Sequence, residues 1–320
     1  RVQADTGDDA EAEFDAPHTI DAIGAAIAKL GHEVVPIEAN AELPRRLGDL
    51  ELDLVFNVAE GLRGRSREAQ VPALLDLLGV EFTGSDAATM AVTLDKGLAK
   101  RLVREAGIPT ARWEVVPVGR TLRNELRLPV IVKPNAEGSS KGVSTKSVVR
   151  EGDELAEAIA EVHRRYGCAA LVEEFLTGRE FTVGLLGNEP PRVLPLMEVV
   201  FTDAADDLPI YSYEHKTSTD PSVRFDVPAQ VEAELEASLR ETAIASFEAL
   251  GCRDVARIDF RLDADGVPHF IECNPLPGLS PGFSDLCVIA ESAGLDHAAL
   301  VAAILSPAVR RLERARTASS

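Results

Sequence analysis

The chain contains 320 residues with a mass of 34.3 kDa, and this length predicts two domains or three subdomains. Hydrophobic residues make up 45% of the sequence and charged residues 27%, which is average for a globular protein and excludes wholesale disorder. The 33 basic residues are outnumbered by 53 acidic ones, and the net charge of −20 argues against nucleic acid or an anionic membrane as the main partner. No run of 18 apolar residues occurs, so no membrane-spanning helix is predicted.

Cysteine usage and the start of the chain bear on the compartment. The four cysteines are scattered without a Cys-x-x-Cys pair, which is typical of reduced thiols in a cytoplasmic protein. The sequence opens at Arg1, and no signal peptide is visible. We therefore expect a cytoplasmic location.

The first part of the chain has the pattern of a parallel α/β unit. Apolar residues recur at helical spacing over residues 19–30, and a glycine follows them as a stop signal. Further on, short apolar runs predict strands that alternate with a helix: strands at 34–37, 52–58 and 80–83, and a helix at 69–78. Because such a unit usually begins with a strand, we expect the opening strand to be missing. Residues 1–88 are thus predicted to form a Rossmann-like domain.

The rest of the chain has an α+β pattern. A helix is predicted over 89–106, because a glycine and a proline follow it. The expected strands are 113–117, 130–133, 143–149, 170–175, 180–187 and 193–200, with helices at 152–164 and 228–250 and a hairpin at 255–274. We assign 89–177 to a central subdomain and 178–320 to a C-terminal domain.

The hairpin carries the strongest chemical signal. Asp265-Gly266 is a preferred pair for a two-residue turn, in which both positions need positive φ. That turn sets Asp259 opposite Glu272, and strand alternation puts four polar side chains on one face: Arg257, Asp259, Glu272 and Asn274. The opposite face is uniformly apolar and is predicted to face the core: Ile258, Phe260, Leu262, Ile271 and Cys273. Facing carboxylates repel unless a cation lies between them, and these oxygens suit Mg²⁺. The alternative is a hairpin with a solvated polar face, which the apolar face disfavours.

Two other stretches fit a nucleotide site. An apolar strand delivers Lys133 and leads into a small loop, residues 137–142, whose backbone N–H groups are able to cradle phosphate oxygens. A surface hairpin turn explains that loop equally well. Residues 171–183 form a strand, a bend and a second strand; a free backbone edge there suits an adenine base, but a plain strand–turn–strand is as good a reading.

Together and in this order, these stretches resemble the ATP-grasp superfamily, most closely the D-alanine–D-alanine ligase branch. The resemblance covers nearly the whole chain, from Gly31-His-Glu-Val through Phe82-Thr-Gly-Ser and Asp95-Lys96 to Asn274-Pro-Leu-Pro-Gly. It implies an ATP-grasp fold with a Rossmann-like N-terminal domain, that is, an α/β part joined to α+β parts that close on ATP. It also implies a homodimer, formed through the N-terminal domain.

The resemblance further implies roles for individual residues. Those that contact the nucleotide would be Lys96, Lys133, Glu137, Gly138, Ser139, Ser140, Glu173, Glu174, Leu176, Glu180 and Lys216. Asp259, Glu272 and Asn274 resemble the Mg²⁺ ligands, and Arg257, Lys216 and Ser139 resemble the catalytic residues. Only seven of the 33 basic residues are lysines, and four of these seven lie in or beside the phosphate-binding stretches: Lys96, Lys133, Lys141 and Lys216. A compact cation at these places suits phosphoryl transfer.

The amino-acid half departs from the family pattern. D-alanine ligases have a His-Gly pair where this chain has Glu60-Gly61, and an acidic Gly-Glu where it has Gly64-Arg65-Ser66-Arg67. They also have a Tyr at the position of Thr217, and a Ser after Pro-Gly where this chain has Gly282-Phe283-Ser284. The candidate substrate-binding residues are therefore Glu60, Arg65, Arg67, Gly278 and Phe283. Arg65 or Arg67 is suited to pairing with an extra substrate carboxylate; a solvated loop is the equal alternative.

These departures predict a ligase with other small substrates. We expect an ATP- and Mg²⁺-dependent enzyme that joins an amino-acid carboxylate to an amine through an acyl phosphate, in a dipeptide or γ-glutamyl-type ligation. The alternatives are a cell-wall D-alanine–D-alanine ligase and a nucleotide-binding protein without ligase activity. An intact set of Arg257, Asp259, Glu272 and Asn274 disfavours the last of these.

Overall fold

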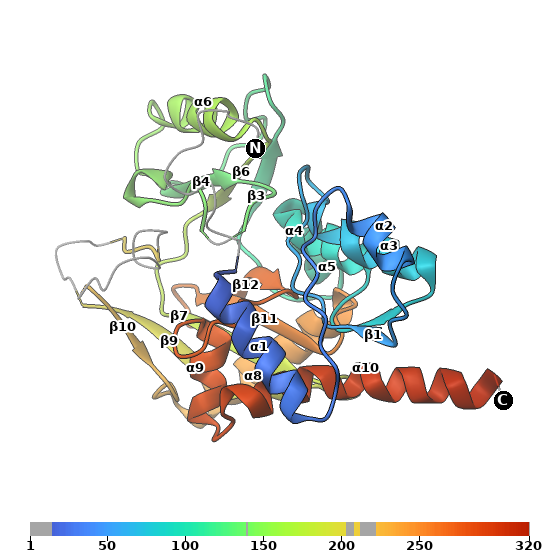
Figure 1. Ribbon diagram of the computed structural model, residues 1–320. Coiled ribbons are helices and arrows are strands. Elements are labelled where there is room, and N and C mark those ends of the chain that lie inside the picture. The colour runs from blue at the N-terminus through green and yellow to red at the C-terminus, as the bar shows by residue number, and fades with distance from the viewer. Residues whose placement is uncertain (1–14, 139, 203–207, 212–221, 320) are drawn as a thin grey trace.

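The computed structural model describes residues 15–138, 140–202, 208–211 and 222–319, and three sheets organise this part of the chain. A two-stranded parallel sheet lies in the N-terminal part, a four-stranded sheet in the centre and a six-stranded sheet in the C-terminal part. Figure 1 shows the four-stranded sheet with helix α6 at the top, the six-stranded sheet below it with α1 over it, and α2, α3 and β1 to one side. Ser139 and Lys216, two of the expected catalytic residues, lie outside the described residues.

The N-terminal part is a βαβ unit preceded by two helices. Strands β1 and β2 pair in parallel, Leu54 with Glu81 and Val55 with Phe82. Its elements are α1 (Pro17–Lys29), α2 (Leu43–Gly48), β1 (Leu54–Val55), η1 (Arg67–Ala69), α3 (Gln70–Leu78) and β2 (Glu81–Phe82). The strands predicted at 52–58 and 80–83 are present but shorter than predicted.

Two predictions in this region are wrong. Residues 34–37 form no strand, because no neighbouring strand bonds to them among the described residues and Val34 and Val35 are exposed. The helix predicted over 89–106 is two helices, α4 (Ala87–Leu94) and α5 (Lys96–Glu105). Asp95 separates them with a ψ of 93°, and its carboxylate caps α5 by accepting from Leu98 N at 3.1 Å. A capping aspartate favours a helix start at this point over a continuous helix.

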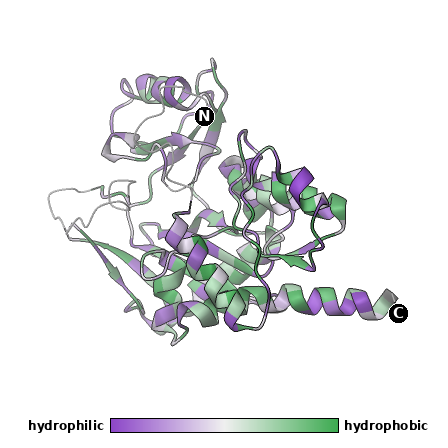
Figure 2. Cartoon of the chain, in the orientation of Figure 1, coloured by the Kyte–Doolittle hydropathy of each residue, from purple (hydrophilic) through white to green (hydrophobic). Residues whose placement is uncertain are grey.

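The central part is an antiparallel sheet covered by one helix. Its strand order is β3-β6-β4-β5. The elements are β3 (Trp113–Val116), β4 (Val130–Pro134), η2 (Thr145–Ser147), β5 (Val148–Val149), α6 (Leu155–Tyr166) and β6 (Ala170–Glu174). Ile159 and Val162 of α6 pack against buried valines of the sheet. Figure 2 shows both hydrophilic and hydrophobic residues on α6, as expected for a helix that covers one face of a sheet. The strand predicted over 143–149 is mostly the turn of η2.

The C-terminal part is the largest body. Its strands are ordered β10-β9-β7-β11-β12, with β8 also paired to β7. The elements are β7 (Glu180–Leu186), β8 (Arg192–Val193), β9 (Met197–Phe201), β10 (Val223–Asp226), α8 (Ala233–Ala249), β11 (Val255–Leu262), β12 (Pro268–Asn274), α9 (Asp285–Ser292) and α10 (His297–Ser319). One hydrophobic cluster joins the sheet to α5 and α8, and a second joins it to α1, α9 and α10. The N-terminal helix α1 therefore packs on the C-terminal body. None of the helices in the described part of the chain combines the length and hydropathy of a membrane span. Together, α9 and α10 reach that length and hydropathy, but they are bent by 102° relative to each other.

The β11–β12 hairpin has the predicted register near its polar end but a different turn. Asp259 pairs with Glu272 and Arg257 pairs with Asn274, as predicted. Toward the turn, Phe260 pairs with Phe270, so Ile271 is an extra, bulged residue. The two-residue turn was wrong, because the Asp263 carboxylate accepts from Asp265 N and Val267 N, both at 2.9 Å, and stabilises a wider loop.

Because of the bulge, two residues of β12 lie on other faces of the hairpin than predicted. Phe270 is fully buried in the core, whereas Ile271, which was expected there, is half-buried and lines the cleft. Only Gly266 of the Asp265-Gly266 pair has a positive φ, at 81°. The predicted pairing of the two acids is correct because the bulge offsets the longer turn by one residue.

Candidate active site

A cleft of about 820 Å³, partly open to solvent, lies between the central and C-terminal sheets. Its walls contain many residues that the sequence suggested for nucleotide and metal binding: Lys96, Lys133, Glu137, Ser140, Glu173, Glu174, Leu176, Glu180, Asp259 and Glu272. These residues come from α5, the central sheet, the loop that follows β4, the connection between β6 and β7, and strands β7, β11 and β12. The fold therefore brings together groups that lie far apart in the sequence.

The two acids of the hairpin lie on the cleft wall, each with a fixed contact. Asp259 accepts a hydrogen bond from Thr182 Oγ1 at 2.8 Å, and its other oxygen lies 3.2 Å from Arg257 Nη2. Glu272 Oε2 lies 3.3 Å from Lys96 Nζ. Asn274 Oδ1 accepts from Leu276 N at 3.0 Å, which orients the amide on the same strand face. Asp259 and Glu272 thus line the cleft, whereas Asn274 lies next to them on β12, opposite Arg257, and is not among the cleft-lining residues.

This donor set fits Mg²⁺. No group of three or more His, Cys, Asp or Glu residues suited to a metal exists among the residues with described positions. Two carboxylates and one amide are nevertheless a sufficient protein contribution, because Mg²⁺ usually binds one or two carboxylates and takes its other oxygens from water and substrate phosphates. Asp259, Glu272 and Asn274 would hold the ion, which neutralises charge on the phosphoryl group when bound.

Arg257 is buried beside these acids and is paired twice. Its Nη1 lies 2.9 Å from Asp285 Oδ2, and its Nη2 contacts Asp259. Burial opposes the charge of the guanidinium, but the two carboxylates outweigh it and raise the pKa of Arg257. Asp285 was not anticipated, because an acid in the first turn of a helix, here α9, is ordinary capping chemistry and gives no sign of a site.

Three buried charges form a chain at the floor of the cleft. Glu173 on β6 lies with Oε1 2.6 Å from Lys133 Nζ and with Oε2 2.8 Å from Lys100 Nζ. Burial alone would raise the pKa of Glu173, but the two lysines lower it to about 2. Lys100 was missed as a site residue because it occupies an ordinary position in an amphipathic helix.

The loop after β4 is held by an arginine from the N-terminal part. Arg67 Nη1 donates to Ala136 O at 2.9 Å, and its Nη2 lies 3.4 Å from Glu137 Oε2. Lys96 Nζ donates to Glu137 O on the same loop. Arg67 is only 7% exposed, so the solvated-loop alternative is wrong for this residue. Arg65 is different: its side chain is 72% exposed and reaches Asp95 at 3.6 Å.

The remaining predicted residues lie around these groups. The Glu174 side chain points to Arg127 and Arg112, at 3.0 and 3.3 Å, and its N–H donates to Arg112 O. Glu180 pairs with Arg261 at 3.2 Å. Arg261 is a buried residue that the sequence did not single out; its guanidinium lies 4.5 Å from the Phe175 ring centroid and donates to Gly178 O.

The candidate amino-acid residues are more dispersed. Glu60 is half-buried, Gly278 is exposed and Phe283 is 68% exposed. Together with Gly138, Arg65 and Arg67, they are absent from the walls of the cleft described above. The role of Gly138 in nucleotide binding and the roles of the other five residues in substrate binding stay predictions.

The site and fold define an ATP-grasp enzyme, and comparison with known proteins agrees. Residues 102–306 match the family model of the D-Ala–D-Ala ligase C-terminus. The chain is 34% identical to the D-alanine–D-alanine ligase of Moorella thermoacetica over 298 residues, covering 90% of this chain and 92% of that protein. It is 36% identical to the uncharacterized protein y4sG of Sinorhizobium fredii over 299 residues, covering 91% and 87%. The crystal structure of the Bacillus anthracis D-alanine–D-alanine ligase complexed with ATP superimposes with a TM-score of 0.75 at 26% identity, covering 92% of this chain and 94% of that one.

The chain therefore belongs to the D-alanine–D-alanine ligase family. The predicted ATP-grasp fold and the family resemblance are confirmed. The protein is an ATP-dependent ligase that forms C–N bonds, with ATP and Mg²⁺ as cofactors. This excludes the second alternative, a nucleotide-binding protein without ligase activity.

Proposed function

We propose that the protein ligates a small amino acid, through its carboxylate, to an amine substrate other than D-alanine. The carboxylate attacks the γ-phosphorus of ATP, the bond to ADP breaks, and an acyl phosphate forms. The amine nitrogen then attacks the acyl carbon, phosphate leaves, and the amine loses a proton. A dipeptide or γ-glutamyl-type product fits this sequence of steps.

The observation that carries the choice of substrate is the ion pair between Arg257 and Asp285, 2.9 Å apart. Arg257 lies beside the proposed metal ligands and already faces two carboxylates. A substrate carboxylate that approached Arg257 would be repelled by Asp285, whereas a substrate ammonium would be attracted. We therefore infer that the amine substrate presents a positive or neutral group to Asp285.

The residue roles follow from charge and position. Lys96 and Lys133 contribute positive charge to the phosphates, and Asp259, Glu272 and Asn274 hold Mg²⁺. Glu180, held by Arg261, faces the nucleotide, and the loop at 137–142 covers the phosphates. Arg67 positions that loop from the N-terminal part. Excluding water matters here, because an acyl phosphate hydrolyses readily.

A second candidate is D-alanyl-D-alanine synthesis for the cell wall. It is supported by the 34% identity to the Moorella thermoacetica ligase across 92% of that protein. In this case Asp285 would only orient Arg257, and an amine substrate with its own carboxylate would bind elsewhere. We further propose three domains at 1–88, 89–177 and 178–320, a homodimer and a cytoplasmic location.

A panel of amino acids and amines separates the two candidates. Phosphate release from Mg·ATP is measured with each pair, and products are identified by mass spectrometry. Our proposal predicts release with pairs that lack D-alanine and amide products of matching mass. Release with D-alanine alone would contradict it and establish the second candidate. Asp285→Asn provides a further check: it should improve the relative rate of amines that carry a carboxylate, and unchanged preferences would count against the role of Asp285.

A further inference from the structure

Lys100 is a fully buried cation close to the nucleotide cleft, and it takes no direct part in the proposed chemistry. Its side chain is 0% exposed, and it is not among the residues that line the cleft. A lysine without solvent normally has a specific partner, because an isolated buried charge is costly. The reason for its presence therefore lies in its contacts.

The ammonium of Lys100 joins three separate elements. Its Nζ lies 2.8 Å from Glu173 Oε2 on the central sheet. It donates to Thr110 Oγ1 at 2.9 Å and to Phe270 O, on the C-terminal sheet, at 3.2 Å. Thr110 Oγ1 independently donates to Phe270 O at 2.8 Å, so that carbonyl is bonded even without the lysine. Glu173 is thus the partner that depends most on Lys100.

Glu173 is shared between Lys100 and Lys133. Its two oxygens contact one lysine each, and only Lys133 lines the cleft. The three groups carry two positive charges and one negative charge. Burial lowers the pKa of Lys100, against the attraction of Glu173, whereas the pKa of Lys133 is raised because Glu173 and Glu272 outweigh its burial. The triad as a whole therefore carries one net positive charge, and Lys133 is the one of its two cations that lines the cleft.

We propose that Lys100 is a positioning residue for ATP: it neutralises Glu173, so that the charge of Lys133 is available to the nucleotide phosphates. Without Lys100, the carboxylate of Glu173 has Lys133 as its only cation within ion-pair distance among the described residues. The charge of Lys133 is then neutralised by the buried carboxylate of Glu173, and its attraction for phosphate is lost. This inference rests on the proposed role of Lys133 in phosphate binding.

The test is a set of binding measurements on the full chain. Dissociation constants for Mg·ATP and for adenosine are measured by calorimetry or by competition with a fluorescent nucleotide. The variants are Lys100→Met, Glu173→Gln, the double variant and Lys133→Met. Methionine keeps the length of the lysine stem and removes its charge, and adenosine controls for damage to the base-binding part of the cleft.

The expected pattern has two parts. Lys100→Met weakens Mg·ATP binding roughly 10- to 100-fold, as expected for the loss of a charge-assisted contact, and it leaves adenosine binding within about twofold. In the Glu173→Gln background there is no carboxylate to neutralise, so adding Lys100→Met changes Mg·ATP binding by no more than about twofold. If Lys100→Met does not fold, the comparison of Glu173→Gln with the double variant still tests the second part.

Three results would overturn the inference. One is normal Mg·ATP binding by Lys100→Met. Another is an equal loss of ATP and adenosine binding, which indicates a merely structural role. The third is a loss of tenfold or more on adding Lys100→Met to Glu173→Gln. Lys133→Met separates this inference from its premise: if that variant binds Mg·ATP normally, the phosphate role of Lys133 is wrong whatever Lys100 does.

Discussion

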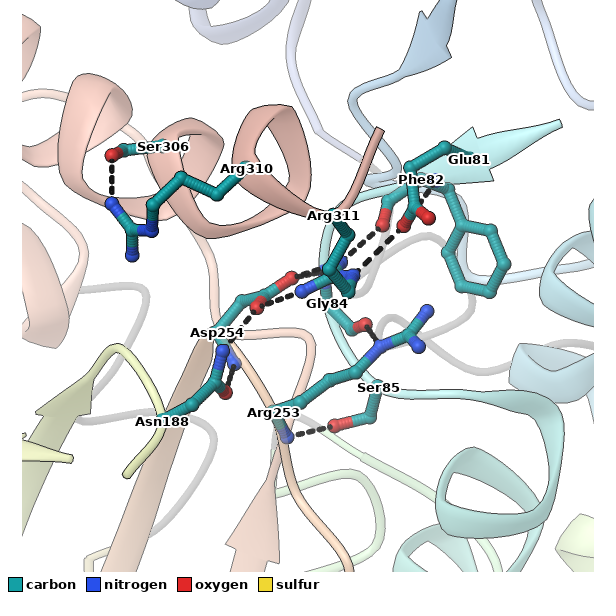
Figure 3. Close-up of polar contacts among 10 residues, drawn as sticks. All are labelled: Glu81, Phe82, Gly84, Ser85, Asn188, Arg253, Asp254, Ser306, Arg310 and Arg311. Carbon is teal, nitrogen blue, oxygen red and sulfur yellow. Dashed lines mark hydrogen bonds and ion pairs between the residues drawn. The ribbon is translucent and has the colours of Figure 1, made fainter. Parts of the chain in front are cut away.

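Replacement of Arg311 by alanine should destabilise the protein strongly, because this arginine joins the N-terminal and C-terminal parts (Figure 3). Its guanidinium lies 2.6 and 2.8 Å from the two oxygens of Asp254, just before β11. It also pairs with Glu81 at 2.9 Å and donates to Phe82 O at 2.8 Å, both on β2. Asp254 is fully buried. One side chain on α10 therefore bonds to two parts of the chain.

The expected loss can be estimated from what remains around Asp254. Removing one partner of a buried ion pair usually costs about 3–5 kcal/mol, because the other charge stays buried. Asp254 would keep two donors, Gly84 N at 2.9 Å and Asn188 Nδ2 at 3.0 Å. We therefore expect the lower end, about 3 kcal/mol, which is a large part of the 5–15 kcal/mol that is usual for a folded domain.

The neighbouring residue supplies a matched control. Arg310 is exposed on the same helix, and its guanidinium donates a hydrogen bond to Ser306 Oγ (Figure 3). The distance of this bond is 2.6 Å. Arg310→Ala should change the free energy of unfolding by no more than about 0.5 kcal/mol. Urea unfolding followed by far-ultraviolet circular dichroism compares the two variants. A loss for Arg311→Ala as small as that of Arg310→Ala would refute this reasoning, as would an undiminished loss in an Asp254→Asn background, where the buried charge is absent.

Three other outcomes are expected. Glu272→Gln should cut amino-acid-dependent phosphate release by orders of magnitude while leaving the circular dichroism spectrum unchanged. The control is Asp265→Asn, the same acid-to-amide change at the exposed tip of the hairpin, which should release phosphate at a near-normal rate. Near-normal turnover by Glu272→Gln would contradict the metal assignment. Gly61→Ala should lower the free energy of unfolding, measured in urea, by at least about 1 kcal/mol more than Gly64→Ala. Both glycines have a positive φ, but of the two only Gly61 would place a Cβ 2.0 Å from a backbone oxygen of η1. Equal losses in the two variants would contradict this steric explanation. The pKa of Glu173 is lowered to about 2 from an ordinary 4.5, so the unfolded chain takes up this proton before the folded chain as the pH falls. About 3 kcal/mol of stability that is present above pH 4.5 should therefore be lost between pH 4.5 and pH 2. Glu173→Gln should lack this part of the acid dependence, and identical pH profiles of the two proteins would show that Glu173 is not its source.

Much of the fold was predictable because its signals are local. Helices with a clear apolar face and a glycine or proline stop, such as α1 and α3, lie close to their predicted places. The strand at 34–37 was wrong because a strand needs a partner, and the sequence of one segment does not reveal whether another lies beside it. The break at Asp95 was missed because apolar periodicity continues across it, while its capping bond depends on the backbone of the next helix.

The site residues also divide into those that local sequence patterns predict and those that they do not. Asp259 and Glu272 were placed opposite each other from the sequence, yet for an incomplete reason: the longer turn at Asp263 is offset by the bulge at Ile271. Both features depend on side-chain and packing details that alternation does not encode. Spacing in the sequence could not identify Lys100, Arg261 or Asp285 as site residues. Each is brought to the site by an ion pair with a residue on a distant element.

Arg67 shows the limit of reading departures from a family pattern. The arginine was suggested as a substrate ligand because it replaces the usual residues of its loop. In the folded chain it is buried and contacts Ala136 and Glu137 in the loop after β4, and its role in substrate binding stays a prediction. Its sequence position could not distinguish contact with substrate from contact with that loop.

The central claim is that the ligase activates a carboxylate as an acyl phosphate before the amine attacks. Once the panel identifies a productive pair, the acid substrate is labelled with ¹⁸O in its carboxylate, and the released phosphate is analysed by mass spectrometry. Our account predicts one ¹⁸O atom in each phosphate formed, because the oxygen that attacks phosphorus leaves with it. Amide product accompanied by unlabelled phosphate would contradict the account.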